Sequence, residues 1–123
     1  MVAFSKPVLF VGNDPMLSKA TAEVLKSAGF KVRTTNPRNI GHVIAAGGYI
    51  AVVLCATLES AEATQAIEAA ERRQPGVPIV SVRLGLLGDG PPPEASVIVD
   101  ALNGPEALVQ AVRSVTTQRK AAS

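Results

Sequence analysis

The residues of this chain that could do chemistry are few, and most of them directly follow a short apolar run. Gly12, Asn13 and Asp14 come after the run VLFV, and Cys55 ends the run YIAVVLC. A carboxylate can act as a hard ligand for Mg²⁺, and a thiolate is a nucleophile. The positions that follow the apolar runs are therefore the first place to look for a site.

Residue counts and spacing exclude several kinds of site. The single histidine, His42, excludes a cluster of histidine metal ligands, and the single cysteine excludes an intrachain disulfide. One unpaired cysteine is typical of a reducing compartment, which predicts a cytoplasmic location. The stretch VGNDP lacks the G-x-G-x-x-G spacing of a dinucleotide loop, and the residues after Cys55 lack the arginine of a phosphatase loop. We therefore expect no enzymatic activity, no metal and no cofactor.

The composition is that of one globular domain. The chain has 123 residues, of which 47% are hydrophobic and 3% aromatic, so its core must be aliphatic. We expect a single domain over 1–123, with the core at 7–115 and a flexible tail at 116–123. The formal net charge of +2 comes without a basic stripe, which predicts no nucleic-acid partner. No apolar run approaches the ~20 residues that span a bilayer, which predicts no membrane contact.

Short apolar runs alternate with amphipathic segments along the chain. Asp14 and Pro15 are suited to begin a helix and Gly29 to end it. A third helix should begin near Ser60, and the stretch NGPE reads as a capping box that begins the last helix. The segment RLGLLGDGPPPEA is rich in glycine and proline, so little regular helix is expected there. The expected strands cover 8–11, 30–32, 49–55, 77–82 and 96–102.

Strands that alternate with helices predict βαβ units and a parallel sheet. The fold class is α/β: a flavodoxin-like, doubly wound sheet of five parallel strands in the order 2-1-3-4-5, with the fourth helix shortened or irregular. In such sheets, ligands bind at the carboxyl ends of the strands. The residues placed there are Gly12, Asn13, Asp14, Cys55, Arg83 and Ala101.

Several of these segments resemble one family. The stretches VLFVGNDPMLSKATAEVLKSAGFKV, YIAVVLCATLE, VPIVSV and GPEALVQAVRSV are similar to the framework of the receiver domain of response regulators in two-component signalling. The resemblance runs from Pro7 to Val115. It implies a receiver fold and a role in signal transduction.

The residues that a receiver needs for phosphorylation are replaced at every matched position. A receiver uses two acidic residues for Mg²⁺, an Asp that accepts the phosphoryl group, a Thr or Ser, and a Lys. The resemblance implies a phosphorelay family, of which this chain would be a degenerate pseudo-receiver that is not phosphorylated at this site. The matched positions are Gly12 and Asn13 for the acidic pair, Asp14 for the less critical third acid, Cys55 for the phosphoacceptor, Arg83 for Thr/Ser, Ala101 for Lys, and Ile98 for the aromatic switch residue.

The expected function is therefore phosphorylation-independent protein–protein interaction in signal transduction. The resemblance implies a protein partner or a homodimer, bound through the face of the fourth helix, fifth strand and fifth helix. Leu84, Leu86, Leu87 and Ile98 are the candidate interaction surface. The alternative is a small-ligand or redox sensor that uses the vacated pocket around Cys55.

Two residues keep two interpretations each at this stage. Cys55 is either a small buried hydrophobic residue or a reactive thiol. Arg83 is either a solvated loop residue or a guanidinium that pairs with Asp14 in the space of the lost metal and phosphate.

Overall fold

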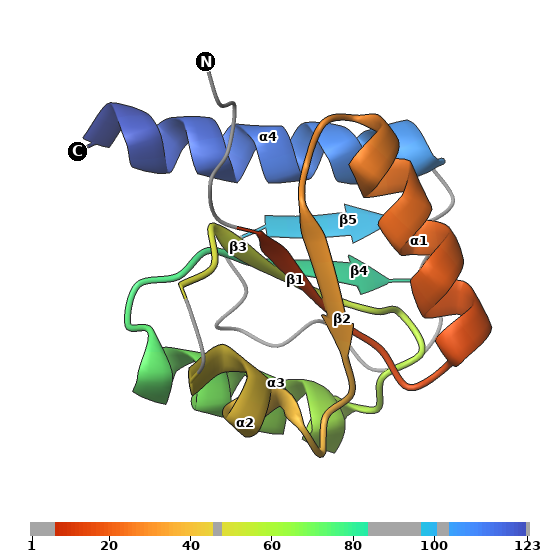
Figure 1. The fold of residues 1–123 in the computed structure, drawn as a ribbon, viewed down its shortest axis with the longest axis vertical. Helices are drawn as coiled ribbons and strands as arrows, with labels where there is room; N and C mark the ends of the chain where they lie inside the picture. Colours follow the sequence, from red (N-terminus) through yellow and green to blue (C-terminus); the bar gives the residue numbers. More distant parts are fainter. Residues whose placement is uncertain (1–6, 46–47, 84–96, 101–103, 123) are drawn as a thin grey trace.

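The computed structural model describes residues 7–45, 48–83, 97–100 and 104–122. Strands and helices alternate through most of this length (Figure 1). No described helix is both long enough and apolar enough to cross a membrane. In chain order the elements are β1 Val8–Val11, α1 Pro15–Ser27, β2 Val32–Thr35, α2 Ile40–Ala45, β3 Ala51–Leu54, α3 Ser60–Arg73, β4 Ile79–Arg83, β5 Val97–Asp100 and α4 Pro105–Ala122.

The five strands form one parallel sheet in the order β2-β1-β3-β4-β5, which confirms the predicted fold. Val8 of β1 lies in register with Val32 on one side and with Ala51 on the other. The strands β1 and β3 are buried at every residue. A strand that helices cover on both faces has a continuous apolar sequence, which is why β1 and β3 could be predicted from the sequence.

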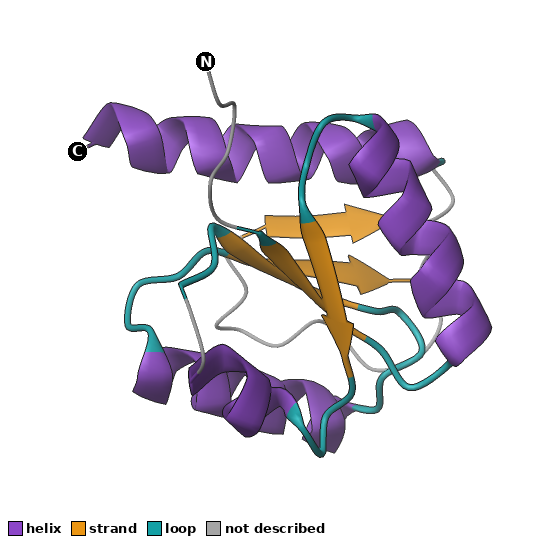
Figure 2. Ribbon diagram, in the orientation of Figure 1, coloured by secondary structure: helices purple, strands orange, loops and turns teal. Residues whose placement is uncertain are grey.

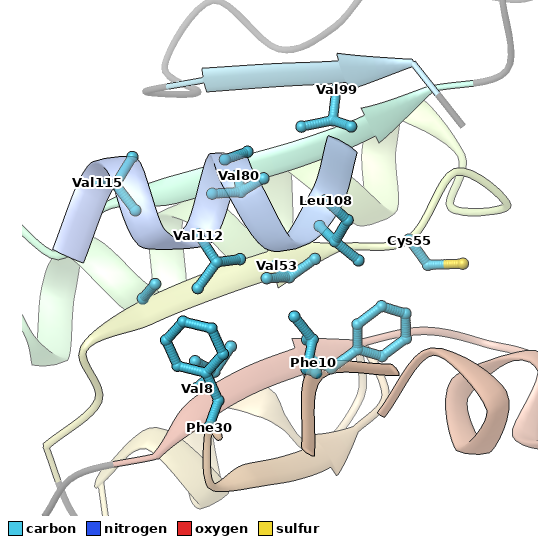
Figure 3. Close-up of a cluster of buried hydrophobic side chains, with 13 residues drawn as sticks. Val8, Phe10, Phe30, Val53, Cys55, Val80, Val99, Leu108, Val112 and Val115 are labelled. Atoms are coloured by element: carbon cyan, nitrogen blue, oxygen red, sulfur yellow. The ribbon is translucent and has the colours of Figure 1, made fainter. Parts of the chain in front are cut away.

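The helices cover the sheet in two layers, with α1 and α4 on one face and α2 and α3 on the other (Figure 2). Side chains alternate between the two faces along each strand. On β3, Val53 therefore packs with Leu25 and Val112 under α1 and α4, as Figure 3 shows for Val53 and Val112. The next residue, Leu54, packs with Ile67 in the layer of α3.

The predicted start of the first helix is confirmed. The Asp14 carboxylate accepts hydrogen bonds from the backbone N–H groups of Met16 and Leu17, at 3.0 and 3.3 Å, and Pro15 is the first helical residue. The helix ends before Gly29, whose φ of 100° lies in the left-handed region that glycine adopts without strain.

Several boundaries differ from the sequence prediction: β3 covers 51–54 instead of 49–55, β4 covers 79–83 instead of 77–82, and β2 and the last helix differ as well. The strand β2 covers 32–35 instead of 30–32, because three of its four residues are polar and two are exposed at a sheet edge, which leaves no apolar run. The helix α4 continues through 116–122, where a flexible tail was expected. Its Thr116 is buried and donates a hydrogen bond to the Val112 carbonyl, and alanine, arginine and lysine in the last turns favour helix.

Part of the prediction falls outside the described residues. This applies to the shortened fourth helix of the predicted fold, which would lie within 84–96, and to the first residue of the NGPE capping box. The label α4 belongs here to the last helix of the chain.

Candidate functional site

The carboxyl ends of β1 and β3 meet, as the parallel topology requires. The Cys55 backbone N–H donates to the Val11 carbonyl at 2.9 Å, and the Gly12 N–H donates to the Thr35 carbonyl at 3.0 Å. Gly12, Asn13 and Cys55 therefore lie together at one edge of the sheet. This is the position at which parallel α/β sheets carry their sites.

A network of side-chain hydrogen bonds joins the loop after β1 to the loop after β3. The Asn13 amide nitrogen donates to the Thr57 carbonyl and to the Glu62 carboxylate, each at 3.3 Å. The Thr57 hydroxyl donates to the Asn13 amide oxygen at 2.7 Å. Both partners of the amide nitrogen are pure acceptors, so the orientation of the Asn13 amide is determined by its surroundings. We call Asn13, Thr57, Glu62 and Cys55 the edge network.

The edge network also determines where the thiol proton lies. The Cys55 sulfur is 3.2 Å from the Thr57 hydroxyl oxygen. A hydroxyl has one proton, and that of Thr57 is given to Asn13, so the Cys55 S–H must be the donor of this contact. The thiol is 6% exposed and belongs to the core cluster, and in Figure 3 its sulfur points away from Val53 and Val112. Cys55 is thus placed as a buried side chain whose sulfur contacts the Thr57 hydroxyl.

Gly12 has no room for a side chain. A Cβ at this position would lie 2.5 Å from the Ser18 hydroxyl oxygen, 3.1 Å from the ring of Phe10 and 3.4 Å from the Cβ of Cys55. Ser18 is a buried residue of α1. The space that an acidic side chain at position 12 would enter is therefore occupied by Ser18.

These residues do not fit a bound Mg²⁺. Magnesium prefers carboxylate and other hard oxygen ligands in octahedral geometry. The edge offers one carboxylate, that of Glu62, which already accepts from Asn13 and from the Glu59 N–H, together with a glycine, an amide whose oxygen accepts from Thr57, and a thiol. Asp14 caps its own helix. Within the described ranges, no group of three His, Cys, Asp or Glu side chains is placed to hold a metal ion.

The other predicted site residues lie further along the edge or outside the described part. Arg83 is the last residue of β4, is partly buried and lies in register with Asp100 of β5. Ser81 is buried, and strand alternation places it on the same face as Ile79. Ala101 and the three leucines of the candidate interaction surface, Leu84, Leu86 and Leu87, lie outside the described residues.

A cavity of about 250 Å³ opens beside the edge network, between α1 and α4. It lies on the face of the sheet that carries Val53 and Cys55. Its described lining is almost entirely apolar. The lining residues are Phe10, Leu17, Ala20, Thr21, Val24, Cys55, Ala56, Thr57, Val82, Val99, Gly104, Pro105 and Leu108.

The sequence did not reveal three residues that shape this site: Thr57, Glu62 and Ser18. The contact between Ser18 and Gly12 depends on how α1 sits on the sheet, which periodicity does not encode. Glu62 carried one readable signal, because it follows Glu59 by three residues at a helix start. The structure has a capping box there, and the Glu59 N–H donates to the Glu62 carboxylate at 3.0 Å.

Comparison with known proteins shows the fold. No family model and no curated protein sequence matches the chain. Solved structures do match. A CheY-like response regulator receiver domain protein from Methanospirillum hungatei is 16% identical with a TM-score of 0.79, over 96% of this chain and 98% of that one.

Two further matches are of the same kind. The receiver domain of a sensor histidine kinase from Pseudomonas aeruginosa, with a magnesium ion coordinated in its active-site cleft, is 16% identical with a TM-score of 0.76, over 93% and 99% of the two chains. A chain from the complex of histidine kinase ThkA with response regulator protein TrrA is 16% identical with a TM-score of 0.73, over 89% and 97%. The chain therefore has the CheY-like receiver fold.

Proposed function

We propose that this chain is a receiver-like signalling module that works by protein–protein interaction and is not phosphorylated. The observation that carries the proposal is the edge network. It joins the loops after β1 and β3 by direct hydrogen bonds, at the edge where a receiver would hold Mg²⁺ and its phosphoacceptor. It includes the buried thiol of Cys55, which the resemblance to receivers matches to their phosphoacceptor.

The chemistry of phosphoryl transfer supports this reading. The reaction needs an available nucleophile and cations that neutralise the charge on the transferred group. The Cys55 thiol is buried and hydrogen-bonded to the Thr57 hydroxyl, and neither Gly12 nor Asn13 offers a carboxylate for a cation. A thiol in this state is a structural group instead of a nucleophile. The same reasoning disfavours the redox form of the alternative function.

The partner is proposed to be a protein, bound at the face that includes β5. Ile98 of β5 is 48% exposed, and β5 is an edge strand of the sheet. An exposed branched side chain on an edge strand is suited to contact another chain. One matched fold comes from a complex of a histidine kinase with a response regulator, which supports a protein partner for this fold.

Phosphorylation is tested by mass spectrometry of the intact protein after incubation with acetyl phosphate and Mg²⁺. We expect no added phosphoryl mass on the wild type. The matched control is Cys55→Ser, which keeps the size of the side chain. A phosphoryl group on the wild type that is absent from Cys55→Ser would sink the proposal.

The interaction surface is tested separately by sedimentation. If the partner is a second copy, the wild type self-associates as its concentration rises and Ile98→Asp does not. Ile98→Val, which keeps a branched apolar side chain, is the control and should behave as the wild type. A wild type that stays monomeric leaves a different protein as the partner. If Ile98→Asp still self-associates, the interface does not include Ile98 of β5.

A further inference from the structure

The cavity between α1 and α4 opens to the surface, because Leu17, Ala20 and Thr57 in its lining are exposed, but it is deeper than a gap left by packing. Interiors are packed as densely as organic crystals, and few of their voids exceed the size of a water molecule. This cavity measures about 250 Å³. For comparison, an engineered apolar cavity of roughly 150 Å³ stays dry and binds benzene.

The space arises because several of the lining residues are small. Ala20 of α1, Ala56 after β3 and Gly104 before α4 leave the room, while Leu17 and Leu108 form the walls. Gly104 has a φ of 88°, in the left-handed region that glycine adopts without strain, so the turn favours glycine at this position. A Cβ added there would meet no atom within 4 Å. The cavity is thus bounded by rigid elements, namely two helices and the ends of strands.

The chemistry of the lining defines what could bind there. None of the described lining residues carries a charge. A charged ligand would lose its hydration without gaining a partner, which is strongly unfavourable. The polar groups at the wall are the hydroxyls of Thr21 and Thr57 and the thiol of Cys55. The Thr57 oxygen accepts one hydrogen bond from Cys55 and has a second lone pair available to a donor.

We propose that this cavity is a binding site for a small, neutral, mostly apolar molecule that carries one hydroxyl or similar donor. A substituted single ring of about ten non-hydrogen atoms matches the volume. The ring lies between Leu17 and Leu108, and the donor faces the hydroxyl of Thr57. The inference rests on the cavity and does not depend on the proposed protein-interaction function.

The test compares two probes that share a ring and differ in charge. Benzyl alcohol and benzoate are titrated separately into the isotope-labelled wild-type protein, and the methyl resonances of Leu17, Val24, Val82 and Leu108 are followed by NMR. We expect saturable shifts with benzyl alcohol, with a Kd on the order of 1 mM. We expect benzoate to bind at least about tenfold more weakly.

A pair of variants locates the site. Ala20→Leu adds a branched side chain at the cavity and should weaken benzyl alcohol binding about tenfold or more. Ala20 is exposed on a helix, where leucine is nearly as favourable as alanine, so the variant should fold. Lys19→Leu is the matched control, because Lys19 lines the separate groove between α1 and β2. It should bind as the wild type does.

Three outcomes would overturn the proposal. The first is that no neutral probe gives saturable shifts at these methyl groups. The second is that benzoate binds as well as benzyl alcohol, which would refute the neutral class of ligand without needing any variant. The third is that Ala20→Leu binds as tightly as Lys19→Leu, which would place the site elsewhere.

Discussion

A side chain at position 12 should clash with Ser18, and the size of the clash can be measured. The Cβ of Gly12→Ala would lie 2.5 Å from the Ser18 hydroxyl oxygen, a distance that real contacts do not show. The Gly12 backbone does not lie in the left-handed region, which among the described residues holds Gly29, Gly76 and Gly104. The effect of this substitution is therefore steric and not a matter of backbone strain.

The magnitude follows from overpacking in a buried site. Forcing an extra carbon into a well-packed region typically costs about 1–3 kcal/mol. Part of this is relieved if the Ser18 hydroxyl rotates to another rotamer. We expect Gly12→Ala to lower the free energy of unfolding by about 1–3 kcal/mol. In a Ser18→Ala background the hydroxyl is gone, so the same substitution should cost about 1 kcal/mol less.

The assay is urea unfolding of the wild type, both single variants and the double variant, which together form a double-mutant cycle. The matched control is Gly41→Ala in α2, where an added Cβ would meet nothing within 4 Å. That substitution should stabilise by about 0.5–1 kcal/mol, because alanine favours helix. The reasoning is refuted if Gly12→Ala and Gly41→Ala have the same effect, or if removing the Ser18 hydroxyl leaves the cost of Gly12→Ala unchanged.

Two further predictions concern the edge network and the core. Thr57→Val removes the hydroxyl that bonds to both Asn13 and Cys55 and should lower the free energy of unfolding by about 1–2 kcal/mol, while Thr57→Ser should change it by less than about 0.5 kcal/mol. Equal urea midpoints for these two variants would contradict the network. Leu25→Ala should cost about 2–5 kcal/mol because Leu25 is fully buried, whereas Met16→Ala, at 83% exposure on the same helix, should cost less than about 0.5 kcal/mol. If Leu25→Ala and Met16→Ala lowered the midpoint of thermal unfolding by the same amount, α1 would have to pack differently from the structure.

The fold could be predicted because its strongest signals are local. The strands β1 and β3 are covered on both faces, so each must be apolar throughout, and an uninterrupted run such as VLFV has few other interpretations. The strand β2 shows the limit of this signal. Its residues Arg33 and Thr34 are exposed at the sheet edge, and the pairing of Thr35 with Val11 that extends β2 is a tertiary contact.

The site could be predicted only as a set of neighbouring positions. Parallel topology alone brings Gly12, Asn13 and Cys55 to one edge, so their proximity followed from the alternation of strands and helices. The partners of these residues did not follow. Thr57 lies in a loop, and its bond to Asn13 depends on the path of that loop relative to a residue 44 positions away. Nothing in a single sequence encodes that distance.

The contact between Asn13 and Glu62 gives a physical reason for a neutral side chain at position 13. The Asn13 amide nitrogen lies 3.3 Å from the Glu62 carboxylate. An aspartate in the same place would set two carboxylates at about that separation. Their repulsion is about 1 kcal/mol in water and about 5 kcal/mol at an effective dielectric constant near 20. Only a bound cation would offset it.

With asparagine at position 13, the contact with Glu62 is a hydrogen bond instead of a repulsion. The two loops are therefore held together without a bound cation. The edge network keeps one carboxylate, that of Glu62, which accepts from the Asn13 amide and from the Glu59 N–H. A conformational equilibrium shifts only toward the state that a ligand binds more tightly. Outside the edge network, such a ligand has two described surfaces to contact, the cavity beside Thr57 and the exposed side of β5.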